Sequence, residues 1–177
     1  MSGRAPKAKL GPGPARRGRE RFAVVAARFN EGISKKLVDG ALAALESHGV
    51  AAGRTEVHWV PGSFELPLAA LTLAGTGRYA GVVCVGVVIR GDTPHFEHVA
   101  REAAAGVREA GLRTGVPVSF GVITALTEEQ AWDRAGGAVG NRGEEAALAA
   151  LEMARWLHQI GAGRRLRGVD GRGRRGR

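Results

Sequence analysis

The sequence predicts a single α/β domain, a three-layer sandwich in which helices flank a four-stranded parallel sheet. Apolar, β-branched segments alternate along the chain with segments whose apolar residues recur at helical spacing. Strands separated by helices need crossover connections, which make neighbouring strands parallel. The chain has 177 residues, enough for one sizeable core, and we expect residues 22–162 to form it.

Two strand–helix units are predicted in the first half of this domain. The apolar run at 22–27 indicates a buried strand, and apolar residues at helical spacing follow it until Gly49. Residues 55–60 indicate a second strand. After the break at Pro61 and Gly62, we expect Ser63 to cap a helix that runs to Gly75.

The second half repeats the pattern. Its predicted elements are a strand at 82–89, a helix from 94 to about 112, a strand at 118–123, a short helix at 127–135 and a long helix at 143–160. Thr93 is expected to cap the first of these helices with Pro94 at its first position, which places His95 in the first turn. Thr127 and Gln130 have the spacing of a capping box.

The net charge of +9 comes from the two ends of the chain. Residues 1–21 and 163–177 each carry a net charge of +6, so the domain between them carries −3. Both ends are rich in Gly and Arg and lack apolar periodicity, and we expect them to be disordered. The sequence therefore does not indicate a basic binding face on the domain, and nucleic acid would bind at most non-specifically through the tails.

No apolar run is long enough for a membrane span and none follows the N-terminal basic residues as in a signal peptide, so we expect a cytoplasmic protein with no membrane partner. The single cysteine, Cys84, lies within an apolar strand. It is typical of a buried thiol, and it excludes a disulfide framework or a thiolate metal site. His95 and His98 lack a third metal ligand nearby, and we expect no metal.

Polar and aromatic residues follow the predicted strands at their carboxyl ends, where open α/β sheets bind ligands. They are Arg28 to Asn30, Pro61 to Glu65, Arg90 to Phe96 and Thr124 to Thr127. His95 would lie beside the unpaired amides of a helix start, which attract anions. The pattern predicts a titratable group next to a phosphate site.

Six segments resemble the lumazine synthase family. They are RFN at 28–30, VPGSFELP at 60–67, VVIRGDTPHF at 87–96, PVSFGVIT at 117–124, RAGG at 134–137 and GNRGEEAA at 140–147. The resemblance extends in order from about Phe22 to Leu157 and implies a flavodoxin-like fold. It also implies the penultimate step of riboflavin biosynthesis, a transferase reaction without a cofactor. In that step 5-amino-6-(D-ribitylamino)uracil condenses with 3,4-dihydroxy-2-butanone 4-phosphate to 6,7-dimethyl-8-ribityllumazine, phosphate and water.

The resemblance also implies roles for individual residues. The pyrimidine and ribityl group would be bound by Phe29, Ser63, Phe64, Glu65, Val87, Val88, Ile89 and Phe120, the phosphate by Gly91, Asp92, Thr93 and Arg134, and protons would be transferred by His95. The residues alone leave simpler alternatives open. Phe29 and Phe120 could pack in the core, Ser63 and Glu65 could belong to an ordinary helix start, and Arg134 could be a solvated charge.

Arg142 departs from the family pattern, because it stands where the family commonly has a pocket lysine. Arginine keeps the charge but presents a wider planar group that stays protonated. We expect it to bind a substrate carbonyl or phosphate. Glu145, one turn away, either orients Arg142 or is a solvated helix acid. If the lysine instead moves protons, the chain would be a weakened relative that binds lumazine or flavin or forms a shell.

The family resemblance implies a homo-oligomer as well. Lumazine synthases form pentameric rings, and some assemble further into decamers or icosahedral 60-mers. Phe120 resembles the aromatic residue that reaches into a neighbouring subunit's pocket, so the active site would be shared. The sequence does not choose among these assemblies.

Overall fold

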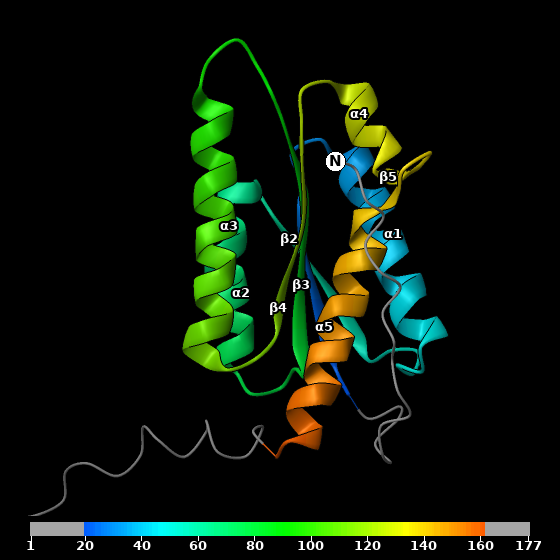
Figure 1. The fold of residues 1–177 in the computed structure, drawn as a ribbon. Coiled ribbons are helices and arrows are strands. Elements are labelled where there is room, and N and C mark those ends of the chain that lie inside the picture. The colour runs from blue at the N-terminus through cyan, green and yellow to red at the C-terminus, as the bar shows by residue number, and fades with distance from the viewer. Residues whose placement is uncertain (1–19, 162–177) are drawn as a thin grey trace, which may run out of the picture.

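The computed structural model describes residues 20–161. The tails predicted to be disordered lie outside the described residues, apart from Glu20 and Arg21 at the end of the first tail. Within the described range, one sheet of four strands forms the middle layer, with helices on both of its faces (Figure 1). This arrangement confirms the predicted α/β three-layer fold.

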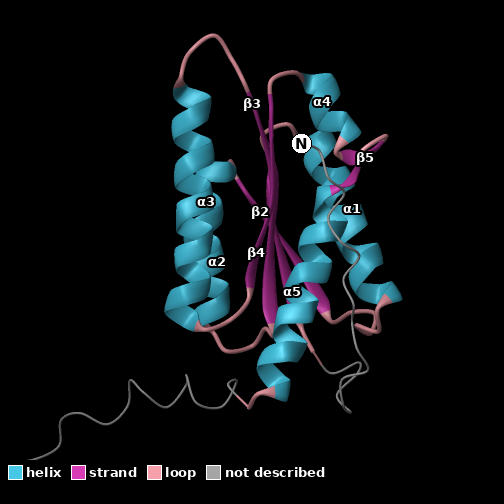
Figure 2. Cartoon of the chain, in the orientation of Figure 1, coloured by secondary structure: helices cyan, strands magenta, loops and turns pink. Residues whose placement is uncertain are grey.

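The four strands are parallel and have the order β2-β1-β3-β4 (Figure 2). Their bounds are Phe22–Ala27 for β1, Thr55–Val60 for β2, Gly81–Ile89 for β3 and Val118–Ala125 for β4. Residues of β1 and β3 are buried almost throughout, as both strands lie inside the sheet and carry helices on both faces. The edge strands β2 and β4 are partly exposed.

Each face of the sheet has its own helices and its own core. On one face lie α1 (Glu31–Ser47), α4 (Glu128–Asp133) and α5 (Arg142–Gln159), and on the other α2 (Leu66–Gly75) and α3 (His95–Thr114) (Figure 1). The first core contains Leu37, Leu45 and Leu151. The second contains Leu66 and Tyr79. The predicted helical spacing therefore identified the faces that pack against the sheet.

Two predicted helix caps are wrong. Ser63 is the first residue of a short 3-10 helix, η1 (Ser63–Glu65), and makes no side-chain cap. Its side chain is directed at β3, where a Cβ on Gly86 would lie 3.0 Å from Ser63 Oγ. Thr93 lies one residue too early, because α3 begins at His95 with Pro94 as its capping residue and no side-chain cap. His95 nevertheless lies in the first turn, as predicted.

The capping box before α4 is confirmed in part. Gln130 N–H donates to Thr127 Oγ1 at 3.2 Å, but the Gln130 side chain accepts from Leu126 N–H, one residue before the cap. The helix ends two residues earlier than predicted, since the chain turns into a short antiparallel hairpin of β5 (Ala135–Gly137) and β6 (Gly140–Asn141). Sequence periodicity cannot indicate strands this short.

Candidate active site at the carboxyl edge of the sheet

The loops after β1 and β2 are joined by backbone hydrogen bonds. Arg28 N–H donates to Val60 O at 2.8 Å, and Phe29 N–H donates to Pro61 O at 3.1 Å. Next in the chain, Asn30 adopts a left-handed conformation with φ 58° and starts α1. Phe29 is thereby held between a strand and a helix with its ring 72% exposed, so it is not a core residue.

The segment after β2 combines one buried and two exposed side chains. Ser63 is buried, and its Oγ has no hydrogen-bond partner among the described residues. Phe64 is 59% exposed. Glu65 is exposed as well, and within residues 20–161 its carboxylate makes no hydrogen bond or ion pair. The Glu65 carboxylate is thus free to meet a polar ligand, whereas the Ser63 hydroxyl is unpaired but buried.

The segment after β3 changes from buried to exposed within a few residues. Val87 and Val88 are buried, and Ile89 is partly exposed at the end of the strand. Arg90 N–H donates to Ala125 O at 2.9 Å, which ties this loop to the end of β4. The following residues, Gly91, Asp92, Thr93, Pro94 and His95, are all exposed. The backbone amides in the first turn of α3 and the His95 imidazole therefore both face solvent, next to each other.

A second polar group lies around the β5–β6 hairpin. Arg142 N–H donates to Arg134 O at 2.9 Å, which joins the two arginine-bearing segments. Arg134 Nη1 donates to Gln130 O at 2.9 Å, and the Arg142 guanidinium forms an ion pair with Glu145, one turn along α5. Both arginines are partly exposed. This arrangement joins the backbones that carry the two arginines at the start of α5, where Glu145 is already paired with Arg142.

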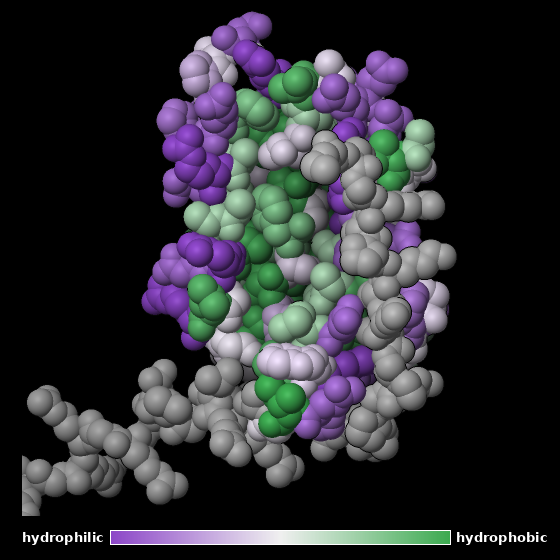
Figure 3. All heavy atoms as spheres, in the orientation of Figure 1, coloured by the Kyte–Doolittle hydropathy of each residue, from purple (hydrophilic) through white to green (hydrophobic). Residues whose placement is uncertain are grey.

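The predicted site residues do not all meet within one chain. The start of α3, with His95, lies on one side of the sheet, whereas α4 and the β5–β6 hairpin lie on the other (Figure 1). Phe120 is 39% exposed and lies five positions before Ala125, the last residue of β4. At about 3.3 Å per residue this is roughly 16 Å from the carboxyl edge. Figure 3 shows an apolar surface between the helix layers, at the open β4 edge.

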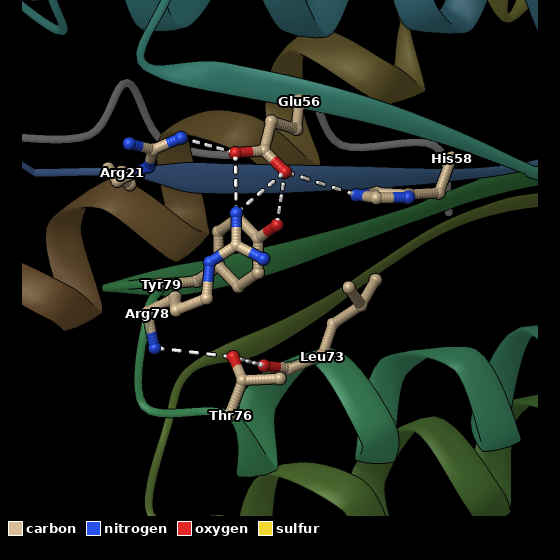
Figure 4. Close-up of polar contacts among 7 residues, drawn as sticks. All are labelled: Arg21, Glu56, His58, Leu73, Thr76, Arg78 and Tyr79. Atoms are coloured by element: carbon tan, nitrogen blue, oxygen red, sulfur yellow. Dashed lines mark hydrogen bonds and ion pairs between the residues drawn. The ribbon is translucent and has the colours of Figure 1, made fainter.

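Another polar cluster lies at the opposite, amino end of the sheet (Figure 4). Glu56, near the start of β2, accepts hydrogen bonds from Tyr79, Arg21 and Arg78, and His58 Nε2 lies 3.7 Å from it. The Tyr79 hydroxyl and the Arg21 guanidinium are the main groups that lower the pKa of Glu56. Burial, and then the bond to Glu56, raises the pKa of Tyr79. No local pattern predicts this cluster, because its members come from three separate segments of the chain, at 21, 56–58 and 78–79.

The described residues contain no group of three or more His, Cys, Asp or Glu that could hold a metal ion. Burial raises the pKa of Cys84 to about 12, so this thiol does not supply a thiolate nucleophile near neutral pH. Within residues 20–161, no helix is both long and apolar enough to cross a membrane.

Sequence reasoning also overlooked Asn141, which caps α5. Its Oδ1 accepts from Gly143 N–H at 2.8 Å and from Glu144 N–H at 3.1 Å. The signal was present, because an Asn before a long helical segment is a preferred N-cap.

Comparison with known families identifies the family of the chain. The sequence model of 6,7-dimethyl-8-ribityllumazine synthase matches residues 19–158. The match begins just before β1 and ends at the last turn of α5. It includes all four strands of the sheet, the loops at their carboxyl ends and the β5–β6 hairpin. The chain therefore belongs to the 6,7-dimethyl-8-ribityllumazine synthase family, which acts in riboflavin biosynthesis.

Proposed function

We propose that the chain condenses 5-amino-6-(D-ribitylamino)uracil with 3,4-dihydroxy-2-butanone 4-phosphate to form 6,7-dimethyl-8-ribityllumazine. The observation that carries this proposal is the exposed segment after β3, in which Gly91 to Thr93 lead directly into the first turn of α3 at His95. It would combine exposed backbone amides, which can bind an anion, with an imidazole, which can accept and donate protons. The reaction needs both, since it expels phosphate and moves protons.

The pyrimidine substrate would bind where the loops after β1 and β2 are joined. The exposed ring of Phe29 offers a flat apolar face to the heteroaromatic ring. The ribityl hydroxyls would meet the exposed Glu65 carboxylate, which has no partner within residues 20–161. Ser63, whose unpaired hydroxyl is buried, would support this segment of the site against β3. Phe64 and the end of β3, residues 87–89, would form the adjoining walls.

The four-carbon phosphate would bind between the loop after β3 and the two arginines. Exposed backbone at 91–93 can approach the phosphate closely, and a Cβ on Gly91 would meet nothing within 4 Å. Arg134 and Arg142 carry planar guanidinium groups that can each pair with two oxygens. Their segments are joined by the backbone hydrogen bond between them.

A site of this composition would be completed between subunits. His95 and Arg134 lie on opposite sides of the sheet in one chain, and Phe120 is the third of the eight residues of the β4 edge strand. We therefore place Phe120, Arg134 and Arg142 of one subunit against the carboxyl edge of the sheet in the neighbouring subunit of a pentameric ring. The partly exposed β4 edge and the apolar surface in Figure 3 support burial against a second copy. A decamer and an icosahedral 60-mer would be assemblies of this ring.

In the reaction, the primary amine of the pyrimidine attacks the ketone carbon, and water leaves as the imine forms. Removal of a proton from C3 and loss of phosphate from C4, the β-position to the imine carbon, break the C4–O bond and leave an enol that becomes a ketone at C3. The second nitrogen then attacks this C3 carbonyl, and a second water leaves as the ring closes to the lumazine. His95 would accept and return the protons that these steps move between nitrogen, carbon and oxygen. Holding both substrates in one pocket supplies much of the remaining acceleration.

The direct test mixes the purified full-length protein with both substrates. We expect the absorbance of the lumazine and free phosphate to appear in equal amounts, faster than in the same mixture without protein. Omitting either substrate provides the control. Product formation no faster than without protein refutes the proposal.

One observation favours a second candidate, a binding protein with little turnover. The Arg142 guanidinium is paired with Glu145, so part of its charge is neutralised before any substrate arrives. Tight binding of the lumazine without its formation from the two substrates would support this alternative.

A further inference from the structure

The side chain of Asn141 joins three elements that lie around the two arginines. Its Nδ2 donates to Lys36 O in α1 at 2.9 Å and to Ala135 O in β5 at 3.3 Å. Its Oδ1 accepts from Gly143 and Glu144 N–H at the start of α5. An amide side chain offers two donors and one acceptor oxygen, and all are used here. A residue that served only as a helix cap would need the oxygen alone.

Two glycines make room for this arrangement. A Cβ on Gly40 would overlap the Asn141 side chain, and a Cβ on Gly143 would overlap the carbonyl of Leu37. Helix α1 therefore approaches Asn141 and the start of α5 to a distance that only glycine allows. Gly40 lies inside a helix, where alanine is intrinsically favoured by about 1 kcal/mol, so its presence there serves the contact with Asn141.

Both arginines are next in sequence to residues that take part in these Asn141 contacts. Arg142 follows Asn141 in the chain, and Arg134 precedes Ala135, whose carbonyl Asn141 holds. The hydrogen bond from Arg142 N–H to Arg134 O closes the arrangement. A shift of Asn141 would therefore move both guanidinium-bearing segments relative to each other and to α1.

We infer that Asn141 is a positioning residue, which fixes the spacing of Arg134 and Arg142 so that both guanidinium groups meet one phosphate. This inference rests on the proposed function, in which these arginines bind the phosphate-bearing substrate. Asn141 touches neither substrate. It acts through the backbone of its two neighbours, and its effect falls on phosphate affinity.

The first test compares Asn141→Ser with Asn141→Ala in the full chain. Serine preserves a cap for α5, and both variants lose the donors to Lys36 O and Ala135 O. We expect both to raise the Kd for inorganic phosphate and the KM for the four-carbon phosphate about tenfold, since small misplacements of binding groups are costly. The KM for the pyrimidine should stay within about twofold. Both should lower the thermal midpoint through the lost hydrogen bonds, Asn141→Ala by more because it also loses the helix cap. Wild-type phosphate affinity in Asn141→Ser would overturn the inference.

A double-mutant cycle with Gly40→Ala tests the same contact from the other side. In the wild-type background the new methyl group displaces the Asn141 side chain, so phosphate affinity should fall by a similar factor. In the Asn141→Ala background there is room for the methyl group, and Gly40→Ala should have no further effect. Additive losses would show that Gly40 acts elsewhere and would contradict the inference.

The phosphate-binding measurement separates this inference from the proposed function. Phosphate affinity that depends on Asn141 in a protein without condensation activity would refute the function and leave the positioning role. Condensation with unchanged phosphate parameters in Asn141→Ser would leave the function and refute the positioning role. A wild-type protein that neither binds phosphate nor condenses the substrates would refute both.

Discussion

The two ends of the sheet carry polar clusters that differ in how far their groups are paired. At the amino end, Glu56 is paired with Tyr79, Arg21 and Arg78. At the carboxyl end, within the described part of the chain, the side chains of Glu65 and His95 make no hydrogen bond or ion pair. The Glu56 carboxylate of the first cluster is already paired within the fold, whereas the Glu65 and His95 side chains of the second have capacity left for a ligand.

The paired groups at the amino end stabilise the fold, whereas the unpaired groups at the carboxyl end are available for function. The hydroxyl of buried Tyr79 needs a partner, and the Glu56 carboxylate supplies it. An exposed imidazole or carboxylate costs little without a partner, because water solvates it. The comparison therefore predicts that substitutions at the amino end change folding stability, while substitutions at the carboxyl edge change activity.

The largest effect is expected for His95→Ala. Loss of a positioned acid–base group should lower kcat by about 10²- to 10⁴-fold without abolishing turnover. The midpoint of thermal unfolding should stay at the wild-type value, since the imidazole is exposed. Steady-state kinetics with both substrates and a thermal scan at fixed protein concentration measure the two effects.

His98→Ala is the matched control, because His98 is also exposed and lies one turn along the same helix. It should retain wild-type kcat. Equal losses in the two variants would mean that the start of α3, and not the His95 imidazole, governs the rate.

Tyr79→Phe should have the largest effect at the amino end. The substitution keeps the buried ring and removes the hydroxyl that donates to Glu56. A hydrogen bond to a charged group contributes about 1.5–3 kcal/mol, so the free energy of unfolding should fall by that amount. Denaturant unfolding at fixed protein concentration measures it. A stability loss below about 0.5 kcal/mol, or a change in kcat, would contradict the claim that the amino end determines stability and the carboxyl edge determines activity.

The fold was predictable from sequence because its strands and helices repeat apolar residues at distinct periods. The buried runs at 22–27 and 82–89 could only be interior strands, and the helices between them required a parallel sheet. The helix starts were less predictable. Ser63 and Thr93 have the chemistry of caps, but Ser63 turns toward β3 and Pro94 delays the start of α3.

The exposure of the loops at the carboxyl edge of the sheet was also predictable, because polar residues that follow a buried strand must leave the core. The contacts of the Asn141 side chain were not predictable, because one of its partners, Lys36 O, lies 105 positions away in sequence. Contacts between distant backbone atoms leave no periodic pattern. Likewise, the pairing of Glu56 with Arg78 and Tyr79 depends on the register of the sheet and not on local spacing.

The amino-end cluster should also make stability depend on acid pH. The pKa of Glu56 is lowered in the fold by Tyr79 and Arg21, so the folded state binds fewer protons than the unfolded state. This stabilisation is complete above the ordinary pKa of glutamate and is lost as pH falls through the lowered value. Thermal midpoints from about pH 7 to about pH 3 should decline less steeply in Glu56→Gln than in the wild type.

Glu109→Gln is the control for this acid dependence. Among residues 20–161, Glu109 pairs only with Arg113 on the exposed face of α3, and such pairs contribute little to stability. Its pH profile should match the wild type. Parallel profiles for Glu56→Gln and the wild type would show that the ion pairs at the amino end do not contribute to acid sensitivity.

The smallest effect is expected for Arg142→Lys, which restores the residue common in the family. If Arg142 supplies charge to a substrate oxygen, lysine can take its place, and the KM of the phosphate substrate should change by well under tenfold, roughly 1.4 kcal/mol. The ion pair with Glu145 can form with either cation, so stability should also be retained. A gain in kcat of about a hundredfold or more would contradict a purely electrostatic role. Such a gain would mean that a proton leaves this position during turnover, which lysine allows and arginine does not, and the carboxyl edge would then contain two proton-transfer groups.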